Sequence, residues 1–214
     1  MRLGVFGGSF DPIHLGHLRL AEEAREGFAL DRVLFIPTWV SPFKTGRVVT
    51  PPEHRLEMVR LATDGNDAFS YSAIECIREG TSYTVETLRN LRAENPSAEL
   101  WFLTGTDAIA DLPRWREPEE VLRLTRFAVA TRAGTTIQQA REGLSHLPGA
   151  WQERISFFPM TNIDISSTDI RSRLGTGRSV HYLLPPDVER YIAAHGLYQT
   201  GDGSVNRGIH APAI

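Results

Sequence analysis

Two histidines three residues apart lie beside a group of glycines near the start of the chain. Residues 7–17 read GGSFDPIHLGH, so the imidazoles belong to His14 and His17. A short apolar run precedes this stretch and apolar residues at helical spacing follow it, as in a strand, a turn and a helix. Glycines let a ligand approach the backbone closely, and the N–H groups of a helix start favour an anion. Imidazole N–H groups add further donors, so the stretch predicts a nucleotide phosphate site.

Two other interpretations of the histidine pair stay open. A His-x-x-His pair can bind zinc with Asp11 nearby. Alternatively, one histidine is exposed to solvent and the other caps the helix, and neither has a further role. No glutamate lies between the two histidines, and the chain contains no His-Glu-x-x-His pattern. The glycine turn and the helix start therefore favour phosphate over metal.

A second group of polar residues lies at 165–174, which read ISSTDIRSRL. Ser166 and Asp169 fit a capping box for a short helix, and a well-capped surface helix is the modest interpretation. Three hydroxyl groups and Arg171 nevertheless gather at the expected helix start. A second phosphate cradle needs that arrangement.

The elements that must position these residues follow from an alternation of apolar runs and helical patterns. The expected strands are 3–6, 32–37, 69–72, 100–104, 127–131 and 155–158, and the expected helices are 15–28, 52–62, 84–94, 117–124, 137–146, 167–174 and 186–195. This alternation predicts an α/β fold, a Rossmann-like doubly wound parallel sheet in a single domain over 1–199. Residues 200–214 are rich in Gly, Ser and Asn and show no periodicity, so we expect a flexible tail.

The expected ligand site lies at the carboxyl ends of the strands, where the winding of such a sheet reverses. In Rossmann-like order the first and fourth strands are neighbours at that point. The first strand ends in the glycine–histidine stretch, and the fourth ends in residues 104–107, which read TGTD. We therefore expect two polar, glycine-containing turns to face one crevice.

The composition excludes several classes of function. The chain has 214 residues, 41% hydrophobic and 23% charged, which suits a globular domain with a sizeable core. A formal net charge of −3 gives no general attraction to nucleic acid or to an anionic membrane, and no apolar run approaches the roughly 20 residues that span a bilayer. Cys76 is the only cysteine, which excludes an intrachain disulfide and a cysteine-based zinc site. With no signal peptide before the first strand, we expect a cytoplasmic protein without nucleic-acid or membrane partners.

The two motifs together resemble those of the nucleotidylyltransferase superfamily. Within it, Gly-Gly-Ser-Phe-Asp-Pro-x-His-x-Gly-His followed by Ile-Ser-Ser-Thr-x-Ile-Arg is similar to the bacterial nicotinate-mononucleotide adenylyltransferases, and the resemblance runs to about residue 198. It implies transfer of the adenylyl group of ATP to nicotinate mononucleotide in NAD biosynthesis, with release of pyrophosphate. It also implies Mg²⁺ that is carried by the ATP phosphates rather than held by a dedicated protein site. The oligomeric state stays open, with a homodimer as one option.

The resemblance also assigns residues to the two substrates. The expected catalytic residues are His14, His17, Lys44 and Arg171. The expected ATP contacts are Gly7, Gly8, Ser9, Phe10, His17, Gly105, Asp107, Ile165, Ser166, Ser167, Thr168 and Arg171. The expected mononucleotide contacts are Ser9, Lys44, Tyr83, Thr84, Val85, Trp115 and Arg132.

Several of these residues also have a plainer interpretation. Trp115 corresponds to a tryptophan that stacks on the pyridine ring in the family, but an indole there can also anchor its loop in the core. Asp107 matches the family's Gly-x-Asp at the ATP ribose, and it can also cap a helix. The backbone N–H groups around Thr84 and Val85 are suited to bind a nicotinate carboxylate.

Two cations on loops complete the expected site. Lys44 corresponds to a lysine that reaches phosphate in the family, although an isolated lysine is usually only solvated. Phe43 replaces the histidine that often precedes this lysine, which removes one polar contact. Arg132 ends the fifth strand, and contact with the nucleotide is one of two options for it.

The implied reaction is in-line attack of a mononucleotide phosphate oxygen on the α-phosphorus of ATP. Because the nucleophile is already an anion at neutral pH, no strong general base and no covalent intermediate are expected. The alternatives are an enzyme acting on nicotinamide mononucleotide or phosphopantetheine, and a catalytically silent nucleotide-sensing module. A dehydrogenase and a P-loop kinase are poorly supported, because the chain has neither Gly-x-Gly-x-x-Gly after the first strand nor Gly-x-x-x-x-Gly-Lys-Ser/Thr.

Overall fold

The computed structural model describes residues 1–42, 50–131 and 135–199. Its centre is a six-stranded sheet of parallel strands in the order β3-β2-β1-β4-β5-β6. The strands are β1 (Arg2–Gly8), β2 (Arg32–Pro37), β3 (Phe69–Tyr71), β4 (Glu99–Gly105), β5 (Arg126–Thr131) and β6 (Ile155–Pro159). The α/β class, the six predicted strands and the placement of β1 beside β4 are confirmed, and the order is Rossmann-like.

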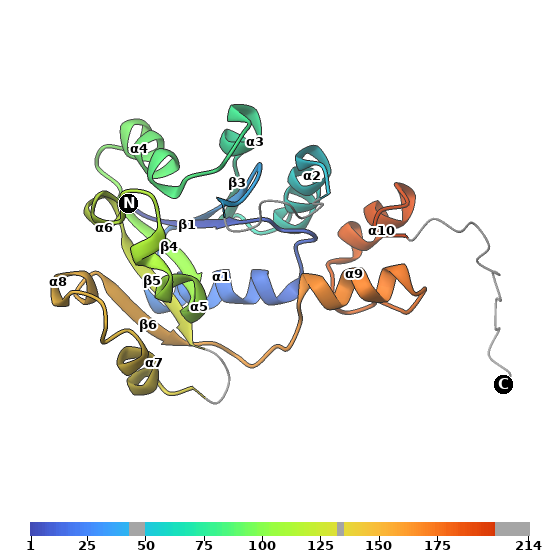
Figure 1. Cartoon of the computed structure of the whole chain (residues 1–214). Helices are drawn as coiled ribbons and strands as arrows, with labels where there is room; N and C mark the ends of the chain where they lie inside the picture. The colour runs from blue at the N-terminus through green and yellow to red at the C-terminus, as the bar shows by residue number, and fades with distance from the viewer. Residues whose placement is uncertain (43–49, 132–134, 200–214) are drawn as a thin grey trace, which may run out of the picture.

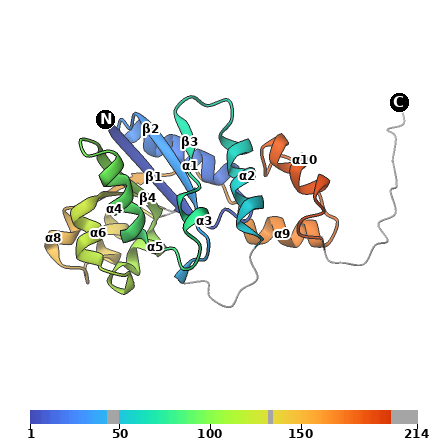
Figure 2. The same cartoon turned by 90° about the horizontal axis from the view of Figure 1, so that it is seen from above.

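Helices cover both faces of this sheet. They are α1 (Leu15–Gly27), α2 (Pro52–Thr63), α3 (Ile74–Arg78), α4 (Thr84–Glu94), α5 (Thr106–Ala110), α6 (Pro118–Leu124), α7 (Ile137–Gly143), α8 (Gly149–Gln152), α9 (Ser167–Gly175) and α10 (Pro186–Ala194), with a 3-10 helix η2 (Leu112–Arg114). Side chains of α1, α2, α9 and α10 pack with Phe6 of β1, whereas those of α4, α5 and α6 pack with its neighbour Val5. Successive side chains of a strand point to opposite faces, so the two apolar clusters form one on each side of the sheet. In Figure 1, α1 and α4 lie on opposite sides of the sheet, and Figure 2 shows α2, α9 and α10 together at one end of the molecule.

The seven predicted helices are present, and some of their ends differ from prediction. The predicted helix 15–28 ends at Gly27, and the predicted helix 137–146 ends at Gly143. The short elements α3, α5, η2 and α8 are not predicted, because three to five residues are too few to show a helical period. The expected turn at 104–107 is wrong in part, since Thr106 and Asp107 form the first turn of α5.

The strands β1 and β4 separate before their carboxyl ends. Their pairing ends at Val5 opposite Phe102, whereas β1 stays paired with β2 as far as Gly8. The strand β4 likewise stays paired with β5 as far as Gly105. The ends of β1 and β4 therefore diverge where the winding reverses, which opens the sheet at the place where such folds bind ligands.

Some predictions fall outside the part of the chain that the structure describes. They concern Phe43, Lys44, Arg132 and the tail at 200–214. The domain boundary at 199 likewise stays a prediction. Within the described ranges, none of the helices has the length and apolar character needed to cross a membrane.

Candidate functional site

Two cavities meet at the carboxyl end of β1. One has a volume of about 430 Å³ and the other of about 490 Å³. Gly7, Gly8 and Ser9 line both of them. The larger, which we call the histidine cavity, gathers all the predicted residues of the two motifs: Gly7, Gly8, Ser9, Phe10, His14, His17, Ile165, Ser166, Ser167, Thr168 and Arg171. The smaller, which we call the tryptophan cavity, adds Thr38, Ser41, Glu75, Ser82, Tyr83, Thr84, Thr104, Trp115 and Arg116.

The two histidines stack at the start of α1. Their ring centroids lie 3.7 Å apart with the planes 27° from parallel. The backbone N–H of His14 donates to Nδ1 of His17 at 3.2 Å, so the proton of that neutral ring lies on Nε2. His14 is only 6% exposed, and burial lowers the pKa of its imidazole to about 4. At neutral pH His14 is therefore an uncharged hydrogen-bonding group rather than a cation.

Small residues make room for these rings. A Cβ atom on Gly16 would lie 3.1 Å from both Cε1 and Nδ1 of His14, and a Cβ on Gly8 would lie 3.0 Å from Cζ of Phe10. Phe10 has a backbone φ of 45°, in the left-handed region. Its ring meets the edge of the His17 ring at 5.1 Å, which fixes the orientation of that imidazole. Gly8 and Gly16 thus leave room for aromatic rings of the motif.

The start of α9 docks directly onto the first motif. Ser166 accepts the N–H of Asp169 at 3.1 Å and caps the helix, as predicted. Ser167 donates to the carbonyl of Pro12 at 2.9 Å, and Arg171 donates through Nη1 to the carbonyl of Asp11 at 2.6 Å. These bonds bring hydroxyl groups and a helix N-terminus to the histidine cavity.

The predicted capping box is wrong in its second half. The carboxylate of Asp169 pairs with Arg173 at 2.6 Å instead of returning to the backbone of Ser166. The Ser166 cap itself is retained, and a carboxylate in the first helical turn still interacts favourably with the helix dipole.

Trp115 lines its cavity while other aromatic rings hold it in place. It meets Phe102 at 5.7 Å and Phe127 at 6.0 Å, in both cases edge to face. Its Nε1–H has no hydrogen-bond partner among the described residues, so these ring contacts hold the indole. The guanidinium of Arg116 lies 4.6 Å from the centroid of the Tyr83 ring, and both residues line the same cavity as Trp115. The loop-anchor interpretation of Trp115 and its place in the cavity are thus compatible.

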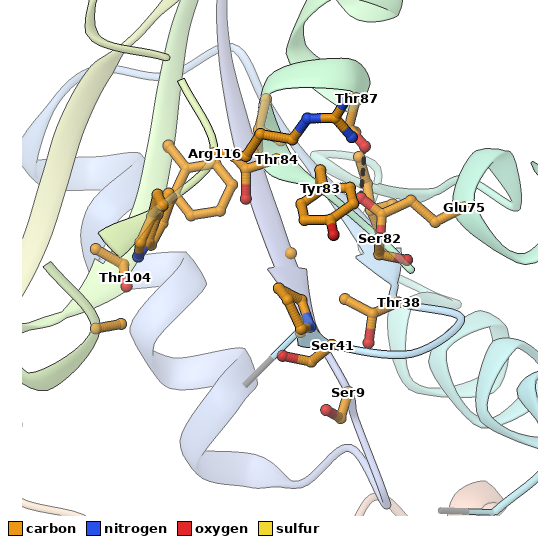
Figure 3. A pocket seen from close by; sticks show the side chains of 18 of the residues that line it. Ser9, Thr38, Ser41, Glu75, Ser82, Tyr83, Thr84, Thr87, Thr104 and Arg116 are labelled. Atoms are coloured by element: carbon orange, nitrogen blue, oxygen red, sulfur yellow. Dashed lines mark hydrogen bonds between the residues drawn. The ribbon is translucent and has the colours of Figure 1, made fainter. Parts of the chain in front are cut away.

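A polar wall of the tryptophan cavity has no counterpart in the sequence prediction. Glu75 is 4% exposed, Thr87 donates to its Oε1 at 2.5 Å, and its Oε2 has no partner among the residues described. Burial raises the pKa of this carboxyl group. Figure 3 shows Ser9, Thr38 and Ser41 toward one end of the cavity and Tyr83, Thr84 and Arg116 toward the other, with Glu75 and Ser82 beside Tyr83. No motif marks Glu75, because its hydrogen-bond partner Thr87 comes from another helix, α4.

Three predicted residues line neither cavity. The side chain of Val85 is fully buried in the core, so only its backbone N–H, in the first turn of α4, is available for the predicted role. Gly105 is the N-cap of α5, and Asp107 is exposed in the first turn of that helix. The interpretation of Asp107 as a helix cap is therefore wrong, and its predicted contact with the ATP ribose stays a prediction.

The residues described offer no dedicated metal cage. Across 1–42, 50–131 and 135–199, no three or more His, Cys, Asp or Glu side chains come together in a group that could hold a metal ion. A hard cation such as Mg²⁺ fits this donor set only if phosphate oxygens and water supply most of its ligands. The two helix N-termini and the neutral imidazoles suit anions instead.

Comparison with known proteins identifies the family. Residues 5–173 match the cytidylyltransferase-like family. The chain is 45% identical over 199 residues to a "Probable nicotinate-nucleotide adenylyltransferase" of Thermomicrobium roseum. The aligned part covers 93% of this chain and 92% of that protein. The chain is 46% identical over 197 residues to a protein of the same name from Roseiflexus sp., covering 92% and 98%.

Solved structures show the same fold at lower identity. Nicotinic acid mononucleotide adenylyltransferase of Plasmodium falciparum, complexed with APC or with NaAD, is 18% identical, with TM-scores of 0.72 and 0.73. The match covers 92% of this chain and 96% and 97% of those chains. At that identity the likeness shows the fold alone, and the relatives that are about 45% identical show the family. The chain belongs to the nicotinate-nucleotide adenylyltransferases, within the cytidylyltransferase-like family.

Proposed function

We propose that this protein transfers the adenylyl group of ATP to nicotinate mononucleotide, giving nicotinate adenine dinucleotide and pyrophosphate in NAD biosynthesis. The observation that carries the proposal is the meeting of two cavities at Gly7, Gly8 and Ser9. An enzyme that joins two nucleotides needs two pockets whose phosphate ends coincide. The names of the relatives support this proposal, as does the complex of the Plasmodium enzyme with NaAD.

In this proposal the histidine cavity binds the phosphates of ATP. His14 and His17 donate as neutral imidazoles, and Ser166, Ser167 and Thr168 present hydroxyl and N–H groups at the start of α9. Arg171 adds a cation at the same place. Gly105 and Asp107 contact the ATP ribose, at the end of β4.

The tryptophan cavity binds the mononucleotide. The pyridine ring of the mononucleotide stacks on Trp115, and the carboxylate on that ring accepts hydrogen bonds from the N–H groups of Thr84 and Val85 at the start of α4. A carboxylate accepts two such bonds, whereas a carboxamide directs a donor at one of them. Ser9, Lys44 and Arg132 bind the mononucleotide phosphate.

The chemistry is positioning and charge stabilisation. The mononucleotide phosphate attacks the α-phosphorus in line, and pyrophosphate leaves. The histidines, Arg171 and the α9 N-terminus donate to oxygens on which charge accumulates, which is where fixed donors lower a barrier most. The enzymes of this family act on ATP with a divalent cation, and we propose that Mg²⁺ carried by the phosphates neutralises part of their charge. We also propose a cytoplasmic location.

Pyrophosphate release tests the proposal. The protein, ATP and Mg²⁺ are incubated with nicotinate mononucleotide, nicotinamide mononucleotide or phosphopantetheine in parallel. We expect rapid release and a dinucleotide product with the nicotinate form. Release with another acceptor alone would keep adenylyl transfer and reject the assignment of Thr84, Val85 and Trp115. ATP binding without release from any acceptor would indicate a nucleotide-sensing module.

A further inference from the structure

The side chain of Arg55 extends from α2 into the interior and is 1% exposed. Its guanidinium donates four hydrogen bonds, all to backbone carbonyl oxygens. Nη1 donates to Ser9 at 2.8 Å and to Thr38 at 2.6 Å. Nη2 donates to Trp39 at 2.9 Å, and Nε donates to Thr50 at 2.7 Å. One planar group thus fixes four points of the backbone.

Two of these carbonyls belong to the walls of the cavities. Ser9 directly follows β1 and lines both cavities, and Thr38 directly follows β2 and lines the tryptophan cavity. Because Nη1 bonds both, Arg55 sets the separation between the ends of these two strands. A lysine cannot reproduce this, since its ammonium lacks the planar fork that reaches several acceptors at once.

The charge of Arg55 is also unusual in its surroundings. It forms no salt bridge with any residue in the described ranges, and the ionisable groups that face it are Asp11, Glu53, Cys76 and Tyr198. A guanidinium stays protonated at neutral pH even when buried. Carbonyl dipoles compensate the desolvation of this charge, and the acidic groups that face it, Asp11 among them, offset part of it.

We infer that Arg55 is a positioning residue for the transfer reaction, which holds the backbone at Ser9 and Thr38 in register behind the place where the two substrates' phosphates meet. The inference rests on the proposed function for the identity of the substrates. Arg55 touches neither substrate, so its effect reaches the reaction only through the shared wall of the cavities. A displacement of that wall by about 1 Å is enough to cost about 100-fold in rate.

Arg92 provides a matched control. It donates to the carbonyls of Pro96, Ala98 and Leu124, which precede β4 and β5 at the amino end of the sheet. Its bonds are of the same kind as those of Arg55, but they lie at the edge of the sheet opposite the cavities. If Arg55 had only a structural role, substitutions at Arg55 and at Arg92 would have the same effect on activity.

The experiment compares Arg55→Lys and Arg55→Met with Arg92→Lys and Arg92→Met. For each folded variant, kcat and KM for both substrates, the Kd of ATP by calorimetry and the Tm are measured. We expect Arg55→Met to lower kcat about 100-fold and to weaken ATP binding about tenfold, and Arg55→Lys to lower kcat about tenfold with ATP affinity nearly kept. Both Arg92 variants should lose Tm while keeping kcat and affinity within about twofold.

Equal kcat per folded molecule in the Arg55 and Arg92 pairs would overturn the inference. If Arg55→Met does not fold, Arg55→Lys decides alone, and wild-type kcat in that variant rejects the inference. If the wild-type protein binds ATP but releases no pyrophosphate with any acceptor, the proposed function fails. The ATP affinities of the four variants then still test Arg55: a loss in Arg55→Met alone supports its role, and equal affinities reject it.

Discussion

His17 carries its ring proton on Nε2, because its Nδ1 accepts the backbone N–H of His14. One side of the ring therefore holds the start of α1, and the ring lines the histidine cavity. His14, stacked on it, is uncharged at neutral pH. At the scale of residues, the pair is a set of oriented neutral donors, which suits phosphate better than a metal ion.

His17→Ala should lower kcat by roughly 100- to 1,000-fold, with the KM for nicotinate mononucleotide nearly unchanged, because a donor to a charged oxygen is lost from the transition state. His17→Asn is the sharper variant, since its Oδ1 can still accept the His14 N–H. It should keep the Tm of the wild type and lose kcat like the alanine variant. Steady-state kinetics and thermal melts check this. Equal losses in kcat and in mononucleotide affinity would contradict the phosphate role.

The stability of the protein should fall as the pH drops from about 6.5 toward 4, because unfolded His14 binds a proton in that range and folded His14, with its pKa lowered to about 4, does not. Stability falls with decreasing pH because, in this range, the unfolded state binds more protons than the native state. Between pH 7 and pH 5 this histidine should contribute a loss of about 2 kcal/mol in the free energy of unfolding. Urea melts of the wild type and of His14→Gln at both pH values test it. The variant should lose less stability than the wild type, and parallel losses would show that His14 titrates normally.

Gly16→Ala should reduce activity, because the new Cβ would lie 3.1 Å from the His14 ring and push it out of place. Gly27, at the end of the same helix, serves as the control, because a Cβ added there would meet nothing within 4 Å. Gly27→Ala should keep kcat and leave stability unchanged or raise it by up to about 1 kcal/mol. We expect kcat/KM of Gly16→Ala to fall at least about tenfold. Similar kinetics for the two variants would show that Gly16 does not set the position of the His14 ring.

At the scale of elements, α9 joins the two motifs that the sequence places far apart. Its cap, Ser166, faces the histidine cavity, while Ser167 and Arg171 bond the backbone beside the first motif. The helix start is thus fixed both by its own cap and by the segment that it must face. A phosphate group bound there meets N–H groups whose direction is set before it arrives.

Ser166→Ala should lower the free energy of unfolding by about 1 kcal/mol, as for other lost helix caps. It should also weaken ATP binding about tenfold, because the start of α9 frays and one hydroxyl is lost. Thr136→Ala is the control: Thr136 caps α7 by accepting the N–H of Gln139 at 3.1 Å, and it lines neither cavity. The control should lose similar stability and keep ATP affinity, as urea melts and calorimetry will measure. Equal affinities in the two variants would argue against ATP phosphates at α9.

The elements that the sequence predicts well are those whose signal is local. Periodicity predicts each strand and long helix, and Ser166 predicts its own cap. The buried groups that hold the site together have no such signal. Arg55 bonds backbone carbonyls, which every residue carries, and Glu75 bonds a threonine on another helix. Only the folded arrangement shows these contacts.

At the scale of the whole molecule, the sheet order predicts where the site must lie but not its shape. The divergence of β1 and β4 beyond Val5 depends on register, which the sequence pattern does not contain. Phe102 and Thr104 of β4 line only the tryptophan cavity, whereas the histidine cavity is lined by the end of β1, α1 and the start of α9, so the one expected crevice is two cavities with a common wall. That common wall is the feature that a two-substrate transfer requires, and it arises from the assembly of the sheet.

The end of the described chain is tied to its beginning. The hydroxyl of Tyr198 donates to Oδ1 of the buried Asp11 at 2.7 Å, and Arg171 bonds the backbone carbonyl of the same residue. The first motif is therefore held by residues near the end of the described chain. Burial raises the pKa of the Tyr198 hydroxyl, so it stays protonated and able to donate over the working range of pH.

Tyr198→Phe should lower the free energy of unfolding by about 1 to 3 kcal/mol, because it leaves a buried carboxylate oxygen without its donor. Tyr182, which is 87% exposed, gives the matched control, and Tyr182→Phe should change stability by less than about 0.5 kcal/mol. Deletion of residues 200–214, which keeps Tyr198, should leave kcat and stability as in the full chain. Urea melts and turnover of the three proteins measure these effects. A deletion variant as unstable as Tyr198→Phe would show that the final residues dock on the fold, and the boundary expected at 199 would then have to move to the end of the chain.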